Sequence, residues 1–354
     1  METHDLRIRP GEQASRHPRQ AGAGIPLDAE RARELGDGVE AELRTFFRNT
    51  RFELFDDRSR LRLKGPDLYY HRLDPDLPAH LGRLGIGGGL AGAGLYRVAT
   101  GTCGICLEDC WSGAFIADTL RRTGPDDALV LVHLDDHADM MPTFLARRAG
   151  GLVDPSTGRT FDPCEAGDWQ SPILSGAIGI GSFVTPLLHA GRTVHIRHLN
   201  NSRDDDAPAP IGPGSVSHAL MPDTDFAAVA WDVPARRSRG TYFASTDPDR
   251  VLSDLPAGRL VVHVDFDYFI NDFNGNPAQS PLPRDTARAP EIVAKATAFF
   301  SALEAAGRKV ERWVIATSPG FCASRHWDGL FDRMQPGIGL TRSRASGLRP
   351  EYSP

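Results

Sequence analysis

Two strongly apolar segments stand out along the chain. Residues 128–134 (ALVLVHL) are apolar except for one histidine, and five of the eight residues at 259–266 (RLVVHVDF) are apolar. A strand of a parallel sheet is buried on both faces, so its sequence shows such a run instead of strict alternation. Four other segments are further strand candidates, at residues 105–107, 192–199, 225–231 and 313–317. The pattern therefore predicts several strands of one buried parallel sheet.

Segments with helical periodicity lie between these runs. Residues 111–122 and 289–306 repeat apolar side chains at helical spacing, and Gly307 is a typical residue for a helix C-terminus. Alternating strands and helices predict an α/β fold, in which helices cover both faces of a parallel sheet in three layers. Residues 200–215 are polar and proline-rich and are expected to form a loop. The glycine-rich run 85–94 lacks the flanking strand and helix of a dinucleotide fingerprint, so a loop is expected there too.

Composition divides the chain into four parts. Residues 1–26 are rich in Arg, Gly, Pro and Gln and are expected to be flexible. Residues 27–100 are expected to form an N-terminal extension packed on the core, and they begin with a helix at 27–48 that weakens near two glycines. Residues 101–335 carry the alternation of strands and helices and form the main domain. Residues 336–354 remain as a C-terminal tail.

Composition and charge narrow the class of protein. The chain has 354 residues, of which 40% are hydrophobic and 24% charged, as in an ordinary globular protein. Its 40 basic and 46 acidic residues give a net charge of −6, so we expect neither a nucleic-acid nor a membrane partner. Residues 1–21 lack the apolar core of a signal peptide, and an odd count of five cysteines argues against a disulfide framework. We therefore expect a cytoplasmic protein, and the sequence leaves a homo-oligomer open.

Acidic side chains follow both of the strongest predicted strands. Asp135, His137 and Asp139 come after the first at alternate positions, and Asp265 and Asp267 come at the end of the second. Ligands of open α/β sheets bind at the carboxyl ends of strands, and alternate residues of extended backbone face the same way. Buried carboxylates repel one another unless a cation neutralises them. The five side chains therefore predict a site for one or two divalent metals such as Mn²⁺, Zn²⁺ or Fe²⁺.

The D-x-H-x-D and D-x-D motifs at this spacing resemble the metal signature of the arginase (ureohydrolase) superfamily. Residues 179–186 (GIGSFVTP) and 318–322 (SPGFC) are similar to a narrower arginase-like family that includes peptide arginases of ribosomal peptide biosynthesis. The resemblance covers roughly residues 100–335. It implies an arginase-like fold and a metal-dependent hydrolase that converts arginine, peptidyl or modified, to ornithine and urea. The partner would then be a small molecule or peptide that contains arginine.

The resemblance also implies a ligand set for two metals, which in this superfamily are usually manganese. Carried over to this chain, Asp135 and Asp265 would bridge the two metals. Asp139 would complete the first metal, and His137 and Asp267 would complete the second. Asp139 would also hydrogen-bond the attacking water and pass on its proton, and His137 is the second candidate catalytic residue.

The sequence departs from the family pattern at one ligand. The family expects a histidine at the end of an earlier strand, usually within an Asp-His step, and this chain has Glu108-Asp109-Cys110 there. A Cys110 thiolate can bind Zn²⁺ or Fe²⁺ but is a poor ligand for Mn²⁺, so Cys110 is a candidate ligand for a softer metal. Five polar side chains near these motifs are candidate substrate contacts: Glu108, Asp109, Ser182, Asn271 and Asp272.

Three other functions stay open at this point. A site of Asp135, His137 and Asp265 alone resembles the single-zinc site of deacetylases related to arginase and would hydrolyse an amide. An iron site with a cysteine ligand would suit an oxidative enzyme. A degenerate metal site would suit a non-catalytic peptide-binding protein. Two metals per chain would favour guanidine hydrolysis, and one zinc would favour amide hydrolysis.

Overall fold

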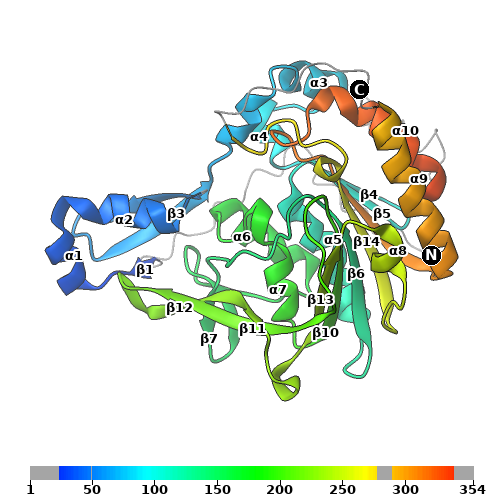
Figure 1. Cartoon of the computed structure of the whole chain (residues 1–354). Coiled ribbons are helices and arrows are strands. Elements are labelled where there is room, and N and C mark those ends of the chain that lie inside the picture. The colour runs from blue at the N-terminus through cyan, green and yellow to red at the C-terminus, as the bar shows by residue number, and fades with distance from the viewer. Residues whose placement is uncertain (1–23, 49, 277–288, 339–354) are drawn as a thin grey trace.

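The strands of the chain form two sheets. The computed structural model describes residues 24–48, 50–276 and 289–338. Its large sheet has twelve strands in the order β4-β5-β15-β14-β6-β10-β13-β11-β12-β7-β8-β9, and its small sheet has the order β1-β3-β2. The large sheet runs through the middle of the molecule, and the small sheet projects from one side (Figure 1). No helix within the described residues is long and apolar enough to cross a membrane.

Six adjacent strands at the centre of the large sheet are parallel, and the apolar segments predicted five of them. They are β5 (Cys103–Cys106), β15 (Val310–Ala316), β14 (Arg259–Asp265), β6 (Ala128–Leu134), β10 (Thr193–Leu199) and β13 (Gly240–Ser245). The parallel strand at residues 240–245 was not predicted, and the strand predicted at 225–231 belongs to an antiparallel strand instead. Every residue of β6 is buried. A continuous apolar run therefore corresponds to a strand that is covered on both faces.

The flanking strands of the large sheet are antiparallel, so the sheet is mixed and not purely parallel. They are β4 (Arg97–Thr100), β11 (Ala209–His218), β12 (Met221–Trp231), β7 (Ala146–Arg148), β8 (Gly151–Asp154) and β9 (Arg159–Phe161). The loop expected at residues 200–215 is therefore wrong from residue 209 onward. Pro213 is tolerated in β11 because only Ala209–Ile211 pair with β13, so Pro213 lies where β11 is paired on one side only.

Helices cover both faces of the central strands, which confirms the predicted α/β architecture. In β6, Leu131 belongs to one apolar core together with Phe115, and Val132 belongs to a second core together with Phe299. The first core is covered by α5 (Ser112–Arg122), α6 (Gln170–Ser175) and α7 (Val184–Leu188). The second is covered by α8 (Pro248–Leu252), α9 (Ala289–Ala306) and α10 (Trp327–Ile338) (Figure 1).

The N-terminal part has its own small sheet. It consists of β1 (Ile25–Pro26), α1 (Ala29–Leu35), α2 (Val39–Phe46), β2 (Thr50–Leu54) and β3 (Arg60–Pro66). The helix predicted at 27–48 is divided at Gly36, as expected, because Gly36 has a left-handed φ of 53°. Strand β1 pairs with β3, so the end of the segment expected to be flexible is ordered, while residues 1–23 and 339–354 lie outside the described residues.

Short helices connect this part to the large sheet. They are α3 (Leu77–Arg83) and α4 (Gly89–Ala93), the second of which replaces part of the loop expected at 85–94. Single 3₁₀ turns occur at η1 (Gly36–Gly38), η2 (Tyr69–Leu73), η3 (Asp109–Trp111), η4 (Ala166–Trp169), η5 (Ile180–Ser182), η6 (Ala235–Arg237), η7 (Phe266–Tyr268) and η9 (Ser324–His326). Four of these turns, η2, η3, η5 and η7, carry residues that reach the site described below.

Aromatic side chains join the N-terminal part to the large sheet, and they give a first prediction. Phe47 is 2% exposed, and its ring centroid lies 4.4 Å from that of Phe144 and 6.4 Å from that of Phe226 in β12. Replacing Phe47 with Ala is expected to lower the free energy of unfolding by about 3–5 kcal/mol, since it leaves a cavity between the two parts. Urea unfolding measures this loss. The matched control Leu95→Ala removes a side chain that is 49% exposed and should change stability by no more than about 0.5 kcal/mol.

Candidate metal centre

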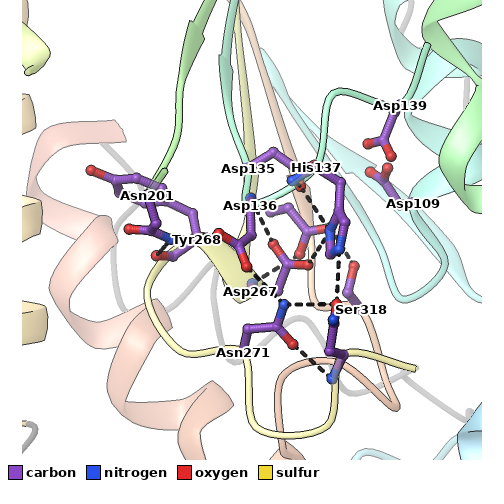
Figure 2. Close-up of polar contacts among 12 residues, drawn as sticks. Asp109, Asp135, Asp136, His137, Asp139, Asn201, Asp267, Tyr268, Asn271 and Ser318 are labelled. Atoms are coloured by element: carbon purple, nitrogen blue, oxygen red, sulfur yellow. Dashed lines mark hydrogen bonds and ion pairs between the residues drawn. The ribbon is translucent and has the colours of Figure 1, made fainter. Parts of the chain in front are cut away.

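The two acidic motifs meet at the carboxyl ends of neighbouring strands. Strands β6 and β14 are parallel and paired, with Val264 opposite Leu134. Asp135 follows β6 directly, and Asp265 is the last residue of β14. The D-x-H-x-D and D-x-D segments therefore begin side by side, at the edge of the sheet where open α/β folds bind their ligands (Figure 2).

A first group of candidate ligands consists of Asp135, His137 and Asp267, whose ligand atoms lie within 4.8 Å of one another. His137 Nδ1 lies 2.9 Å from Asp267 Oδ2 and 3.6 Å from Asp135 Oδ1. The backbone amide of His137 donates to Asp135 Oδ1 at 2.7 Å, which closes the loop after β6. On the outer side, His137 Nε2 lies 3.0 Å from Asn274 Oδ1. These three side chains could together hold one cation.

A second group consists of Asp109, Asp135 and Asp265, again within 4.8 Å of one another. Asp139 lies beside it, with its carboxylate facing that of Asp109 (Figure 2). Asp139 has a left-handed backbone with φ 50°, a conformation that non-glycine residues adopt mainly at turns and functional sites. The Oδ2 atoms of Asp109, Asp135 and Asp139 are buried and have no hydrogen-bond partner within the described residues.

Burial and mutual repulsion dominate the electrostatics of these side chains. Burial, reinforced by repulsion from the neighbouring carboxylates, raises the pKa values of Asp135 and Asp265 well above the usual range. Burial raises the pKa of Asp109 to about 7. Burial would lower the pKa of His137, but its hydrogen bond and ion pair with Asp267 raise that pKa to about 10. A divalent cation would replace the protons that this crowding otherwise demands.

Three buried histidines lie in a row beneath the carboxylates. His198, His133 and His263 occupy the same register on β10, β6 and β14. His263 Nε2 lies 2.8 Å from Asp109 Oδ1, and His198 Nε2 donates to the backbone oxygen of Asp135 at 3.0 Å. His263 thus holds the side chain of Asp109 in place from below, and His198 holds the backbone of Asp135.

Two of the predicted substrate contacts are bound to structural partners. Glu108 is buried, accepts a hydrogen bond from the Tyr70 hydroxyl at 2.6 Å and forms an ion pair with His71. The hydroxyl of Ser182 caps the turn η5 by accepting from the Gly179 amide at 3.0 Å. Neither side chain lines the cavity described below, so the structure does not bring either one to the site.

Two further predicted contacts support the site from outside the cavity. Asp272 is 1% exposed and is held by Arg325 at 3.0 Å and by His326 at 3.3 Å. The amide of Asn271 donates to Asp136 Oδ2 at 2.9 Å, and its oxygen accepts from the Asn274 backbone at 2.8 Å. Asn271 therefore positions the loop that carries Asn274. Of the five predicted substrate contacts, only Asp109 lines the cavity.

Cys110 is not brought to the carboxylate cluster. Its side chain is 5% exposed and belongs to the apolar core below α5. No group of three or more candidate ligands among the described residues includes a cysteine, and all five cysteines are free and buried. Burial raises the pKa of the Cys110 thiol well above its usual range, which favours the neutral thiol.

The acidic side chains form the floor of a cavity of about 560 Å³. Its floor comprises Asp109, Asp135, His137, Asp139, Asp265 and Asp267. Tyr70 and Phe321 line its wall, and Tyr69, Met141 and Trp231 line it with side chains that are 39%, 58% and 44% exposed. We call Tyr69, Met141 and Trp231 the apolar rim.

Sequence reasoning did not identify the rim or the role of Ser318. The Ser318 hydroxyl donates to Asp265 Oδ2, from a backbone with φ 45°. Ser318 belongs to the SPGFC segment at residues 318–322, so that motif could have indicated that Ser318 lies at the site. Tyr69 and Tyr70 come from η2, outside the main domain, and no local pattern marks them.

No protein-family model matches the chain, and no curated protein matches it.

Proposed function

We propose that the protein is a metal-dependent hydrolase of a guanidino group, and that its substrate is an arginine side chain, peptidyl or modified. One observation carries the proposal. Five carboxylates and one imidazole converge on the floor of a single cavity, at the ends of neighbouring parallel strands. The two motifs that supply most of them, D-x-H-x-D and D-x-D, are those whose spacing resembles the arginase superfamily.

The residues present fit divalent cations. Three buried carboxylate oxygens on the floor lack hydrogen-bond partners within the described residues, and such oxygens are costly to bury unless a cation binds them. Asp135, His137 and Asp267 would hold one cation, and the carboxylates around Asp135 and Asp265 would hold another. A set of carboxylates with one imidazole suits Mn²⁺ well. Cations bound there would supply the Lewis acidity that activates a water molecule near neutral pH.

The side chains of the floor have two tasks in this reaction. Their negative charge attracts a guanidinium cation and orients its carbon towards the sheet edge. The water adds to that carbon, the bond between carbon and the side-chain nitrogen breaks, and that nitrogen takes up a proton to leave an ornithine amine and urea. Asp139 Oδ2 is a buried atom of the floor without a hydrogen-bond partner among the described residues, so it can accept the proton of the water and return it to the leaving nitrogen. The reaction consumes water alone.

The apolar rim supports a substrate larger than free arginine. Tyr69, Met141 and Trp231 are large apolar side chains exposed around an acidic floor, and exposed apolar surface of this kind marks binding sites. The α-carboxylate of free arginine would need a cationic partner, and the described residues that line the cavity include neither arginine nor lysine. A peptide would place its arginine on the floor and its neighbouring residues on the rim.

Incubation of the manganese-loaded protein with arginine-containing peptides tests the proposal. We expect urea to appear together with a peptide mass that is lower by one CH₂N₂ unit. Peptides with lysine in place of arginine, and the variant Asp267→Asn, are the controls and should give no urea. The absence of urea from free, peptidyl and hydroxylated arginine alike, with metal supplied, would overturn the assignment.

A substitution in the rim tests the choice of a peptide. Replacing Trp231 with Ala is expected to raise KM for an arginine peptide about tenfold and to leave kcat nearly unchanged, since the rim contacts groups remote from the reacting carbon. Steady-state kinetics separate the two constants. Leu174→Ala is the matched control, because Leu174 is 45% exposed and does not line the cavity. A fall in kcat at constant KM would contradict a role in peptide binding.

A further inference from the structure

We propose that Asp109, rather than Cys110, supplies the ligand from the β5 end of the site, so that the second cation position is built from oxygen atoms alone. Its members would be Asp109, Asp135, Asp139 and Asp265. The inference deepens the proposed function, because it assigns ligands within the same site. Metal counting tests it whatever the substrate is.

The position of Asp109 carries the inference. Asp109 follows β5, which comes directly before β6 in the chain but is separated from it in the sheet by β15 and β14. Its ligand atom lies within 4.8 Å of those of Asp135 and Asp265, and its carboxylate faces Asp139 (Figure 2). The side chain is only 3% exposed. A buried carboxylate among three others is expensive unless they share a cation.

The two oxygens of Asp109 have different roles. Oδ1 accepts from the Ser112 hydroxyl at 3.1 Å and lies 2.8 Å from His263 Nε2. Oδ2 is buried and has no hydrogen-bond partner among the described residues. Metal-binding carboxylates are commonly anchored in this way through the oxygen that does not bind the metal.

Asp272 shows the contrasting arrangement of a carboxylate that serves structure. Its Oδ1 accepts from Arg325 at 3.0 Å, and its Oδ2 accepts from the Ala323 amide at 3.1 Å. Both oxygens are therefore engaged. Asp109 differs from Asp272 because its Oδ2 has no hydrogen-bond partner among the described residues, so this oxygen is available to bind a cation.

The local backbone explains why Asp109 and Cys110 cannot both face the site. Asp109–Trp111 form the 3₁₀ turn η3, in which successive side chains differ in direction by about 120°. With Asp109 directed at the carboxylates, Cys110 is turned towards the apolar core, where it is found. The thiol is therefore a packing residue. A set of four carboxylates favours a hard cation such as Mn²⁺ over Zn²⁺ or Fe²⁺ bound through sulfur.

Metal counting on three forms of the full chain tests the assignment. The wild type, Asp109→Asn and Cys110→Ser are reconstituted with Mn²⁺, freed of excess metal and examined by elemental analysis. We expect two manganese atoms per chain in the wild type and in Cys110→Ser, and one in Asp109→Asn. Electron paramagnetic resonance provides a second readout, because coupled manganese pairs and single ions have different spectra.

Cobalt substitution tests the role of sulfur without relying on the folding of a variant. A thiolate bound to Co²⁺ gives a charge-transfer band in the near ultraviolet, and we expect the cobalt-loaded wild type to lack that band. A band that disappears in Cys110→Ser would overturn the inference, as would two manganese atoms in a folded Asp109→Asn. If the wild type binds no manganese, the proposed function fails together with the inference. If the wild type binds two and Asp109→Asn also retains two, only the inference fails.

Discussion

Replacing Asp135 by asparagine is expected to remove both cations and to lower turnover by at least about a thousandfold, since Lewis-acid activation contributes several kcal/mol to such reactions. Asp135 belongs to both groups of candidate ligands and is 1% exposed. A neutral amide at its position would supply one weak oxygen ligand where two cations need an anionic one. Manganese content and the rate of urea release measure the two effects.

The neighbouring Asp136 offers a matched control. Its carboxylate is half-buried and accepts hydrogen bonds from Asn201 at 3.0 Å and from Asn271 at 2.9 Å, away from the carboxylate floor. Asp136→Asn removes the same charge at the position between Asp135 and His137, and it should retain both manganese atoms. Full metal content in Asp135→Asn would show that the bridging role assigned to Asp135 is wrong.

Removing the metal is expected to destabilise the protein. A cation that binds only the folded state stabilises it by about 2.7 kcal/mol at a free concentration a hundred times its Kd. For a chain of 354 residues this corresponds to a Tm increase of roughly 4 °C. Thermal unfolding with manganese and with chelator measures the difference. Equal Tm values in the two conditions would contradict metal binding at the floor.

The variant Asp139→Asn distinguishes the effect of repulsion between carboxylates on stability from the effect of metal binding. In the metal-free protein this change removes one of the carboxylates that face each other, so it should raise Tm relative to the metal-free wild type. The same change should reduce the increase in Tm that manganese produces, because a ligand has been lost. An unchanged manganese effect in Asp139→Asn would exclude Asp139 from the ligand set.

The central strands and the two motifs could be predicted because they depend on local pattern. The run 128–134 is β6 to the residue, and 289–306 is α9 to the residue. Strand β11 could not be predicted from its own residues, because its prolines are typical of a loop. It is a strand because it forms a hairpin with the following strand, β12. Tertiary pairing there overrides the local preference of the chain.

The details of the site depend on orientation and on partners that are distant in sequence. Cys110 and Asp109 are adjacent, and only the phase of the turn η3 decides which of them faces the carboxylates. Glu108 and Asp272 read as free acidic groups, but the chain brings His71 and Arg325 to them from 37 and 53 positions away. Ion pairs between residues so far apart in the chain produce no periodic pattern in the sequence, so they could not be predicted from it.

The order of the strands governs when this fold can form. In the sheet, β14 and β15 lie between β6 and β5, yet the chain reaches them only at residues 259 and 310. Until they are synthesised, β5 and β6 have no permanent neighbours on their inner edges, and such open apolar edges promote aggregation. Pairing between segments so far apart is also slow. Asp265 and Asp267 arrive with β14, so the proposed cation site can form only after β14 has been synthesised and has paired with β6. Low temperature or chaperones during expression should therefore increase the yield of protein in which this site is complete.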